Sequence, residues 1–481
     1  MSHQWLTTIV YLAWLGGAAC FVLGLHQMNS PATARNGNRL SAGGMTVAVV
    51  ATLVGLVTRE GGLSGIAWAI IVVGFALGGG AGLYTARSVK MTAMPQLVSL
   101  FNAVGGGAAA LVAIDDFIRL TNGSAAGVDT TIFVVLGAVI GSVTFTGSLI
   151  AGGKLQGLIA GKPIQVPGGQ LVTSAIATIA VVGTVVLILG STGVLSLSGG
   201  ATLAVLAVVV AAGLVFGITM VLPIGGADMP VVISLLNSFT GTAAAMAGFV
   251  IQNPVLIISG ALVGASGAIL TKLMADAMNR SVLNIMVGGF GGGEGTVGAM
   301  VGAGGGSVRE VSADDVAIQL AYAQHVIVVP GYGLAVAQAQ HQVRELAELL
   351  ESRGVDVTYA IHPVAGRMPG HMNVLLAEAN VPYPQLREMD EINPEFDRCD
   401  VALVVGANDV TNPAARRPGS PVSGMPILDV DHARSIVVIK RSMGRGYAGI
   451  DNELYANPKT GMLFADAKAG LQALVAAVKA V

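Results

Sequence analysis

Long apolar runs dominate the first 280 residues of the chain, and shorter apolar runs separated by charged segments follow them. Nine of the long runs could each cross about 30 Å of hydrocarbon as a helix. They lie near residues 5–27, 42–58, 63–83, 94–114, 131–151, 170–190, 200–222, 229–252 and 255–276. The pattern therefore predicts a multi-pass α-helical membrane bundle of about nine spans over residues 1–280.

The second part of the chain has the pattern of a soluble α/β domain. Residues 281–311 are rich in glycine and favour a flexible linker, and residues 312–481 form the predicted domain. Ser312 and Asp315 resemble a capping box, with a helix expected over 313–322. Strands are expected at 325–330, 356–361, 401–405 and 435–440, with a helix of about 20 residues after the first strand. This alternation predicts a parallel sheet of Rossmann-like type.

The distribution of charge supports the same division. Residues 1–280 hold only 10 Lys and Arg and 6 Asp and Glu, and the remaining residues hold 15 and 21. If the N-terminus lies outside, the inner segments carry most of the cations, and the outer loops carry only Arg59 and Arg119. The inner cations are Arg35, Arg39, Arg87, Lys90, Lys154, Lys162, Lys272 and Arg280. The positive-inside rule then places the C-terminal domain in the cytoplasm.

Composition excludes several classes of protein. A chain that is 53% hydrophobic is not an ordinary soluble protein. A net charge of −2 argues against a nucleic-acid partner. The two cysteines, Cys20 and Cys399, stand far apart and indicate neither a disulfide framework nor a metal site.

Few polar side chains interrupt the predicted spans, and four of them are candidates for a proton or ion path: Asn102, Asp228, Asn237 and Ser266. Polar groups are costly in lipid, so these residues are expected to face the bundle interior. Taken alone, Asn102 and Ser266 fit interhelical hydrogen bonding at least as well as a path. Asp228 followed by Asn237 favours a functional role, although Asp228 could also cap the start of a helix.

The first strand of the predicted domain runs into Pro330-Gly331-Tyr332-Gly333. A strand, a glycine turn and a helix are what a dinucleotide site requires, because the helix N-terminus offers free N–H groups to a pyrophosphate. The third glycine of the usual fingerprint is replaced by Val336, so this motif alone is weak. Strand 356–361 leads into His362 and brings no carboxylate for a ribose 2′-hydroxyl, which does not favour NAD.

Other strand ends carry chemistry that suits a phosphorylated nucleotide. Lys440, Arg441 and Ser442 close the strand at 435–440 and could hold a 2′-phosphate, although a solvated basic strand end is the alternative. Loops rich in glycine follow two other strands, at 364–370 and 406–409, and the loop at 446–449 could fold as a lid. Each loop alone is an ordinary connection, but together they predict a pocket at the carboxyl edge of the sheet.

Several longer stretches of the chain strongly resemble the β subunit of proton-translocating NAD(P) transhydrogenases, and the resemblance covers essentially the whole length. They are residues 225–230, 260–264, 330–340, 362–367, 369–376, 406–409 and 440–443. The resemblance implies nine membrane helices and a cytoplasmic NADP(H)-binding domain. It also implies that hydride passes directly from NADH on a partner α subunit to NADP⁺ on this chain, coupled to passage of a proton. No catalytic side chain is implied, because the cofactors carry the chemistry.

The resemblance also implies which residues bind NADP(H), with Lys440, Arg441 and Ser442 at the 2′-phosphate. The full set is Tyr332, Gly333, Val364, Ala365, Gly366, Arg367, Met368, Pro369, Gly406, Ala407, Asn408, Asp409, Val410, Lys440, Arg441, Ser442, Met443, Gly444, Arg445, Gly446, Tyr447, Ala448, Asp466 and Ala467.

One residue departs from the pattern of some family members, which have a membrane histidine where this chain has Asn102. Asparagine does not titrate near neutral pH. The proton then passes either by a histidine of the partner subunit or along water past Asn102, Asn237 and Ser266, with Asp228 as the gate to the nucleotide domain. The family also implies a dimer of α–β units in the bacterial inner (plasma) membrane.

Two other classes of protein fit parts of the same pattern. A secondary transporter with a regulatory nucleotide domain needs the bundle and the sensor but no hydride transfer. A membrane anchor for a soluble dehydrogenase needs no polar residues in its spans. NADPH formation from NADH that responds to a proton gradient would separate the transhydrogenase from both.

Overall fold

The structure is a computed structural model that describes residues 2–57, 63–89, 93–123, 127–160, 163–164, 168–225, 228–278, 281–288, 308–366, 370–418, 420, 422–444, 446 and 450–481. The chain forms two compact units. The helical unit comprises Met1–Ile224 and Val232–Thr271, and the sheet unit comprises Gly225–Val231 and Lys272–Val481.

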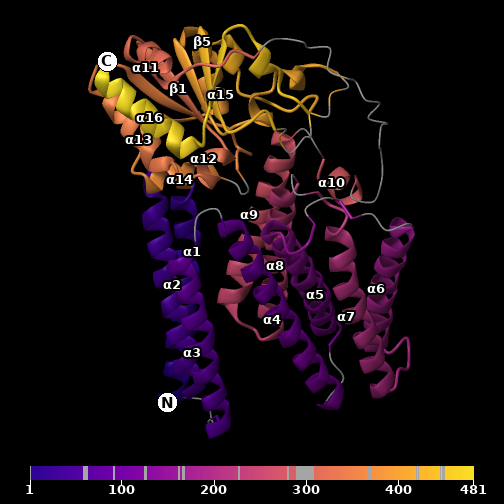
Figure 1. Cartoon of the computed structure of the whole chain (residues 1–481). Coiled ribbons are helices and arrows are strands. Elements are labelled where there is room, and N and C mark those ends of the chain that lie inside the picture. Colours follow the sequence, from indigo (N-terminus) through magenta and orange to yellow (C-terminus); the bar gives the residue numbers. More distant parts are fainter. Residues whose placement is uncertain are drawn as a thin grey trace. The chain divides into compact units, whose positions relative to one another are not determined.

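Nine helices in the described part of the chain are long and apolar enough to cross a membrane. Figure 1 shows them as α1 to α9. They are α1 Ser2–Gln27, α2 Pro31–Val57, α3 Gly65–Ser88, α4 Met94–Gly123, α5 Val128–Gln156, α6 Gly169–Ser191, α7 Gly199–Val221, α8 Met229–Val250 and α9 Pro254–Ala277. Each coincides with one predicted apolar run, so the membrane bundle predicted from hydropathy is confirmed.

Close approach of the helices depends on glycine. A Cβ atom added to Gly241 of α8 would lie 2.5 Å from the backbone nitrogen of Gly264 in α9. A Cβ atom added to Gly260 of α9 would lie 2.5 Å from the backbone nitrogen of Ala245 in α8. Both distances are too short for any side chain, so α8 and α9 pack backbone against backbone, as small residues allow in membranes.

The sheet unit contains six parallel strands in the order β3-β2-β1-β4-β5-β6. The strands are β1 His325–Pro330, β2 Asp356–Ile361, β3 Leu386–Glu388, β4 Val401–Val405, β5 Ser435–Lys440 and β6 Thr460–Phe464. The four predicted strands are present, which confirms the Rossmann-like fold class. Sequence reasoning missed β3 and β6, because β3 has only three residues and β6 contains a glycine.

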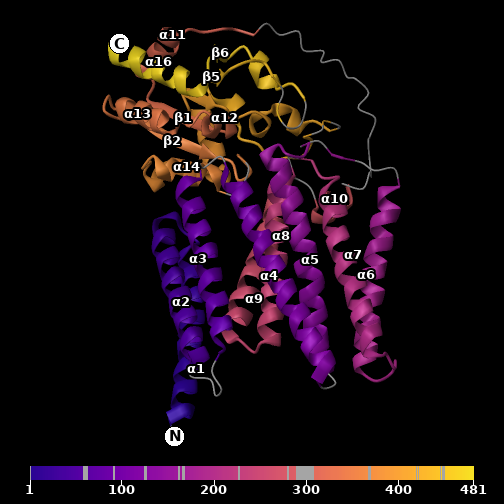
Figure 2. The ribbon, with the colours of Figure 1, turned by 60° about the horizontal axis from the view of Figure 1, so that its bottom comes forward.

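Helices pack around this sheet, and Figure 2 shows α13 and α16 running beside the strands. They are α11 Ala313–Ala321, α12 Tyr332–Val336, α13 Gln340–Glu351, α14 His371–Glu378, α15 Met389–Ile392 and α16 Ala467–Ala480, with short 3-10 turns between them. The hydrophobic core includes valine and isoleucine side chains of the strands that are completely buried, such as Ile327, Val404 and Val438. Burial of these apolar side chains is the main force holding the unit together.

The predicted capping box is present, since Ser312 and Asp315 exchange their side-chain and backbone bonds at the start of α11. The single helix of about 20 residues predicted after β1 is wrong. The chain forms α12 and then α13, because Gln338 takes a left-handed conformation with φ 50°. The N–H of Ala339 donates to the carbonyl of Leu334 at 3.1 Å and closes the first helix. A non-glycine residue rarely adopts this conformation, so the sequence did not reveal the break.

The predicted linker over 281–311 begins with a short helix, α10 Val282–Gly288. Residues 308–311 already belong to the edge of the sheet, since the N–H of Val311 donates to the carbonyl of Met462 at 3.0 Å. The glycine-rich residues 289–307 lie outside the described part. The boundaries proposed for the linker stay a prediction.

Candidate functional site

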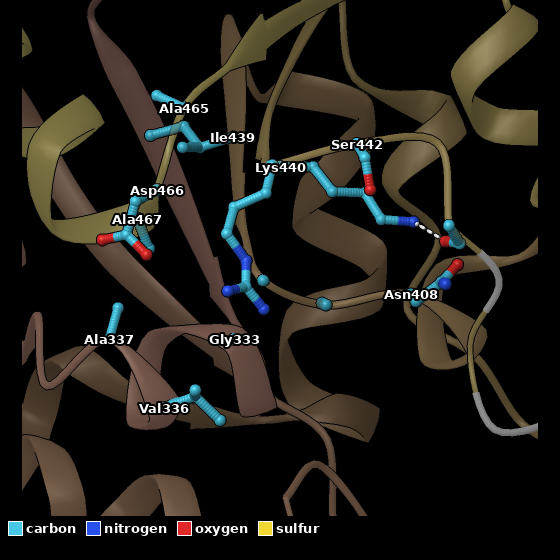
Figure 3. Close-up of a pocket in the computed structure, with 14 residues that line it drawn as sticks. Gly333, Val336, Ala337, Asn408, Ile439, Lys440, Ser442, Ala465, Asp466 and Ala467 are labelled. Atoms are coloured by element: carbon cyan, nitrogen blue, oxygen red, sulfur yellow. Dashed lines mark hydrogen bonds between the residues drawn. The ribbon is translucent and has the colours of Figure 1, made fainter.

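A cavity of about 260 Å³ opens at the carboxyl ends of β1, β4, β5 and β6 (Figure 3). Its lining residues are Gly333, Val336, Ala337, Gly406, Ala407, Asn408, Ile439, Lys440, Arg441, Ser442, Gly444, Ala465, Asp466 and Ala467. The strands β1 and β4 are neighbours in the sheet although β2 and β3 lie between them in the chain. This reversal of strand order is where open α/β sheets bind their ligands.

Two glycine turns form one side of the cavity and pack against each other through backbone atoms. The N–H of Gly331 donates to the carbonyl of Val405 at 2.9 Å, and the N–H of Gly333 donates to the carbonyl of Gly406 at 3.0 Å. A Cβ atom on Gly333 would lie 2.7 Å from the Cα of Gly406, which itself has φ 70°. Both positions require glycine, so the two turns expose backbone where a ligand can approach closely.

The end of β5 provides the basic side of the cavity. Lys440 is half-buried, and its ammonium donates to the carbonyl of Gly444 and lies 4.7 Å from the ring centroid of Tyr455. Figure 3 shows Lys440 and Ser442 on the same segment of the pocket wall. Burial lowers the pKa of Lys440 from its ordinary value, while the carboxylates of Asp409 and Asp451 act in the opposite direction. A partly desolvated ammonium beside a hydroxyl is suited to bind an anionic oxygen.

The loop after β4 is held from behind by residues that sequence reasoning did not select. The hydroxyl of Tyr455 donates to the side-chain oxygen of Asn408 at 2.9 Å. The side-chain amide of Asn452 donates to the backbone carbonyl of Asn408 at 3.0 Å. These bonds fix the orientation of a pocket-lining residue. No local motif identifies Tyr455 and Asn452, because they reach the loop only through the tertiary fold.

The pocket brings together part of the predicted NADP(H)-binding set. The predicted residues that line it are Gly333, Gly406, Ala407, Asn408, Lys440, Arg441, Ser442, Gly444, Asp466 and Ala467. Tyr332, Val364, Ala365, Gly366, Asp409, Val410, Met443 and Gly446 are described but are not among its lining residues. Arg367, Met368, Pro369, Arg445, Tyr447 and Ala448 lie outside the described residues. The lining residues that were not predicted are Val336, Ala337, Ile439 and Ala465, each close in sequence to a predicted one.

Asp466 has a structural task at the pocket, because it caps the start of α16. Its carboxylate accepts the N–H of Lys468 at 3.1 Å. Figure 3 shows Asp466 and Ala467 together on one side of the cavity. The N-terminal end of a regular helix of 14 residues is thus part of the pocket wall.

His362 anchors the loop that follows β2. The histidine is 2% exposed, and the N–H of Val364 donates to its Nδ1 at 3.2 Å. Its Nε2 is therefore the protonated nitrogen and donates to the carbonyl of Pro426 at 2.9 Å. Burial lowers the pKa of His362 to about 4, against which the bond to Pro426 acts weakly. The ring is neutral at pH 7 and joins two loops without adding charge.

In the helical unit, the structure brings Asn102 of α4 against α8. The side-chain amide of Asn102 donates to the carbonyl of Ile233 at 3.4 Å, and the hydroxyl of Thr240 donates to the backbone carbonyl of Asn102 at 3.3 Å. Asn237 is half-buried and stands one helical turn after Ile233. Ser266 instead bonds within its own helix, to the carbonyl of Val263 at 3.3 Å. The interhelical hydrogen bonding expected for Asn102 is present, and the bond of Ser266 stays inside α9.

Asp228 immediately precedes α8, in the place of a capping residue. Its backbone N–H donates to the carbonyl of Gly225 at 3.1 Å, which closes a turn. Gly226 and Ala227 of the same motif lie outside the described residues.

Comparison with known proteins agrees with this architecture. The family model of the NAD(P) transhydrogenase beta subunit matches residues 10–477. Two relatives from Rhodospirillum rubrum, one of them from strain ATCC 11170, are each named NAD(P) transhydrogenase subunit beta. Each is 47% identical to this chain over 99% of it and 100% of the relative. The chain therefore belongs to the NAD(P) transhydrogenase beta subunit family, membrane-bound oxidoreductases that transfer hydride between NAD(H) and NADP(H).

Proposed function

We propose that the cavity at the carboxyl edge of the sheet binds NADP(H), with Lys440, Arg441 and Ser442 at the 2′-phosphate. Two adjacent cations and a hydroxyl at one strand end supply charge-assisted hydrogen bonds that a phosphate can use and a ribose hydroxyl cannot use fully. His362, directly after β2, is buried and neutral and offers no carboxylate to a ribose 2′-hydroxyl. The basic end of β5 is the observation that carries this proposal.

The glycine turns support the same assignment. Gly333 and Gly406 line the cavity, leave no room for side chains and present bare Cα atoms there. Such a surface lets a pyrophosphate approach the backbone. When bound, NADP(H) supplies the hydride chemistry at its nicotinamide ring. The residues of this chain hold and orient it, and none of them needs to react.

A beta subunit has an alpha subunit as its partner, and we propose the following division of roles between the two. NAD(H) binds to the α subunit, hydride passes directly between the two nucleotides, and two α–β units form the complete enzyme. The excess of Lys and Arg on one set of loops supports a cytoplasmic location for the nucleotide domain.

Proton passage is coupled to this exchange through the polar residues of the bundle. Asn102, Asn237 and Ser266 mark the path, and Asp228 is the gate between the path and the nucleotide domain. Asn102 donates a hydrogen bond to the carbonyl of Ile233, one helical turn before Asn237 in α8, and this contact supports the roles of Asn102 and Asn237. By linkage, a state that binds NADP(H) differently also binds the proton differently.

The test measures affinity of the full-length chain for NADPH and NADH in detergent. Lys440→Ala combined with Arg441→Ala should weaken NADPH binding at least roughly 100-fold and leave NADH binding nearly unchanged, since each lost charged hydrogen bond costs roughly 1.5–3 kcal/mol. Arg434→Ala is the matched control, because Arg434 immediately precedes the same strand at its amino end and pairs with Asp400 at 2.9 Å. Equal affinity for both nucleotides in the unmodified chain would overturn the proposal.

The coupling role of Asp228 has its own test. Asp228→Asn keeps the size of the side chain, removes its charge and replaces one acceptor oxygen by an NH2 donor. Gradient-driven NADPH formation should fall strongly in this variant, while the amount of folded protein stays the same. Unchanged gradient-driven activity would rule out the gate.

A further inference from the structure

Lys154, near the C-terminal end of α5, is a buried cation in the helical unit. Its side chain is 5% exposed. The ammonium donates to the carbonyls of Ile224 at 2.8 Å and Val221 at 3.4 Å, and also to that of Leu222. An ammonium has three hydrogen-bond donors, and backbone carbonyls take all of them.

The three carbonyls belong to the end of α7 and the residues directly after it. The last carbonyls of a helix lack partners within the helix and carry a partial negative charge, so a cation placed there is stabilising. The N–H of Ile164, from the connection after α5, adds a bond to the carbonyl of Leu222 at 3.2 Å. The end of α7 is therefore fixed from α5 and from the connection that follows α5.

The segment fixed in this way leads directly to Asp228. Three residues separate Ile224 from Asp228, and the turn begins at Gly225, whose carbonyl accepts the N–H of Asp228 at 3.1 Å. Lys154 thus sets where the chain leaves α7 and enters the turn. The segment before this turn is anchored by a charged side chain that belongs to a different helix.

We propose that Lys154 is a positioning residue for Asp228, acting through the carbonyls of Val221, Leu222 and Ile224; this inference rests on the coupling role proposed for Asp228. The ammonium holds the start of the turn in one place relative to α5, so that the carboxylate of Asp228 changes its environment only together with the bundle. Without the cation, the turn moves independently, and proton passage loses its connection to hydride exchange while the bundle stays folded.

The alternative is that Lys154 only clamps α5 to α7. The chain contains a matched control for that role, because the hydroxyl of Thr146 in α5 donates to the carbonyl of Leu214 in α7 at 2.7 Å. Thr146 precedes Lys154 by the same number of residues as Leu214 precedes Leu222. Thr146→Val removes a side-chain bond between the same two helices without reaching the turn.

The experiment uses the complete enzyme with its α subunit in proteoliposomes. NADPH formation from NADH is measured with and without an imposed proton gradient, together with the melting temperature, for Lys154→Met, Lys154→Arg, Thr146→Val and Asp228→Asn. Lys154→Met should reduce the stimulation by the gradient roughly tenfold or more. Lys154→Arg, which keeps the charge, should recover part of the stimulation. Thr146→Val should keep the stimulation of the unmodified enzyme even if its melting temperature falls as far as that of Lys154→Met.

Each outcome has a distinct meaning. If Lys154→Met and Thr146→Val respond alike to the gradient, Lys154 is a clamp and the inference is overturned. If Lys154→Met does not assemble, Lys154→Gln, which retains two donors and no charge, decides in the same way: unmodified stimulation overturns the inference. If Asp228→Asn keeps its stimulation, the proposed gate itself fails. Loss of stimulation in Asp228→Asn but not in Lys154→Met removes only the role of Lys154.

Discussion

Different interactions stabilise the interior of the sheet unit and the interior of the helical unit. In the sheet unit, valine and isoleucine side chains such as Val404 and Val438 leave water and form a continuous core. In the helical unit, helices meet through glycine backbones and through hydroxyl groups that reach carbonyls, as Ser238 of α8 reaches Gly264 of α9 at 2.6 Å. Lipid is as apolar as leucine, so apolar side chains gain nothing by leaving it, and contact distance and polar bonds decide the packing instead.

This difference affects where function can be located. In the sheet unit, Ala407, Ile439 and Ala467 are buried core residues that also line the cavity, whereas Lys440, Arg441 and Ser442 line it without belonging to the core. The polar side of the cavity can therefore change without loss of the fold. In the helical unit, Asn102 and Lys154 are both structural contacts and candidates for coupling. Substitutions there must be compared with controls that break a similar contact elsewhere.

The largest effect is expected where helix backbones touch. Gly241→Leu forces a side chain into the backbone of α9, where even a Cβ atom has only 2.5 Å. We expect the assembled protein to be lost, because neither backbone can move without separating α8 from α9. Fluorescence-detected size-exclusion chromatography of detergent extracts would measure the yield of assembled protein. Gly74→Leu is the control, since nothing described lies within 4 Å of a Cβ atom at Gly74 in α3; equal yields of the two variants would contradict the expectation.

The next effect concerns the apolar core of the sheet unit. Ile327→Ala, at a completely buried position of β1, should lower the free energy of unfolding of a fragment spanning 308–481 by about 3 kcal/mol, through lost burial and the cavity left behind. Ile318→Ala in α11, where the side chain is half exposed, should cost less than about 1 kcal/mol. Urea denaturation of both fragments measures the difference. Similar losses would mean that the core around Ile327 does not dominate stability.

A smaller effect depends on pH and comes from His362. Its pKa is about 4 in the fold and 6.5 in the unfolded chain, so the unfolded state binds more protons between these values. The contribution of His362 to the stability of the fragment is therefore full above pH 6.5 and is lost as the pH falls toward 4, by about 2 kcal/mol between pH 7 and pH 5. His362→Gln should remove this part of the pH dependence. His432→Gln, at an exposed histidine paired with Asp397, should retain it.

The two units also differ in what their sequences allow to be predicted. The spans and four strands follow from apolar periodicity, which is a local property of the chain. Gln338 could not be identified as a helix break, because its left-handed conformation depends on packing. Lys154 could be assigned only to an inner, positively charged segment, since its carbonyl partners lie more than 60 residues away. In the sheet unit, parallel strands place their carboxyl ends at one edge, so local motifs alone indicated much of the pocket.

The smallest effect is expected at the surface of the sheet unit. Lys479 of α16 pairs with Glu345 of α13 at 2.9 Å, and both side chains are more than half exposed. A double-mutant cycle on the fragment should give less than about 0.5 kcal/mol, because water screens the pair and ordering two long side chains costs entropy. The bond between Ser238 and Gly264 has a similar length but is buried, and Ser238→Ala should lower the melting temperature of the full-length chain measurably. If the exposed Lys479–Glu345 pair stabilised the protein as much as the buried Ser238 bond, burial would not explain how strongly a polar contact stabilises either unit.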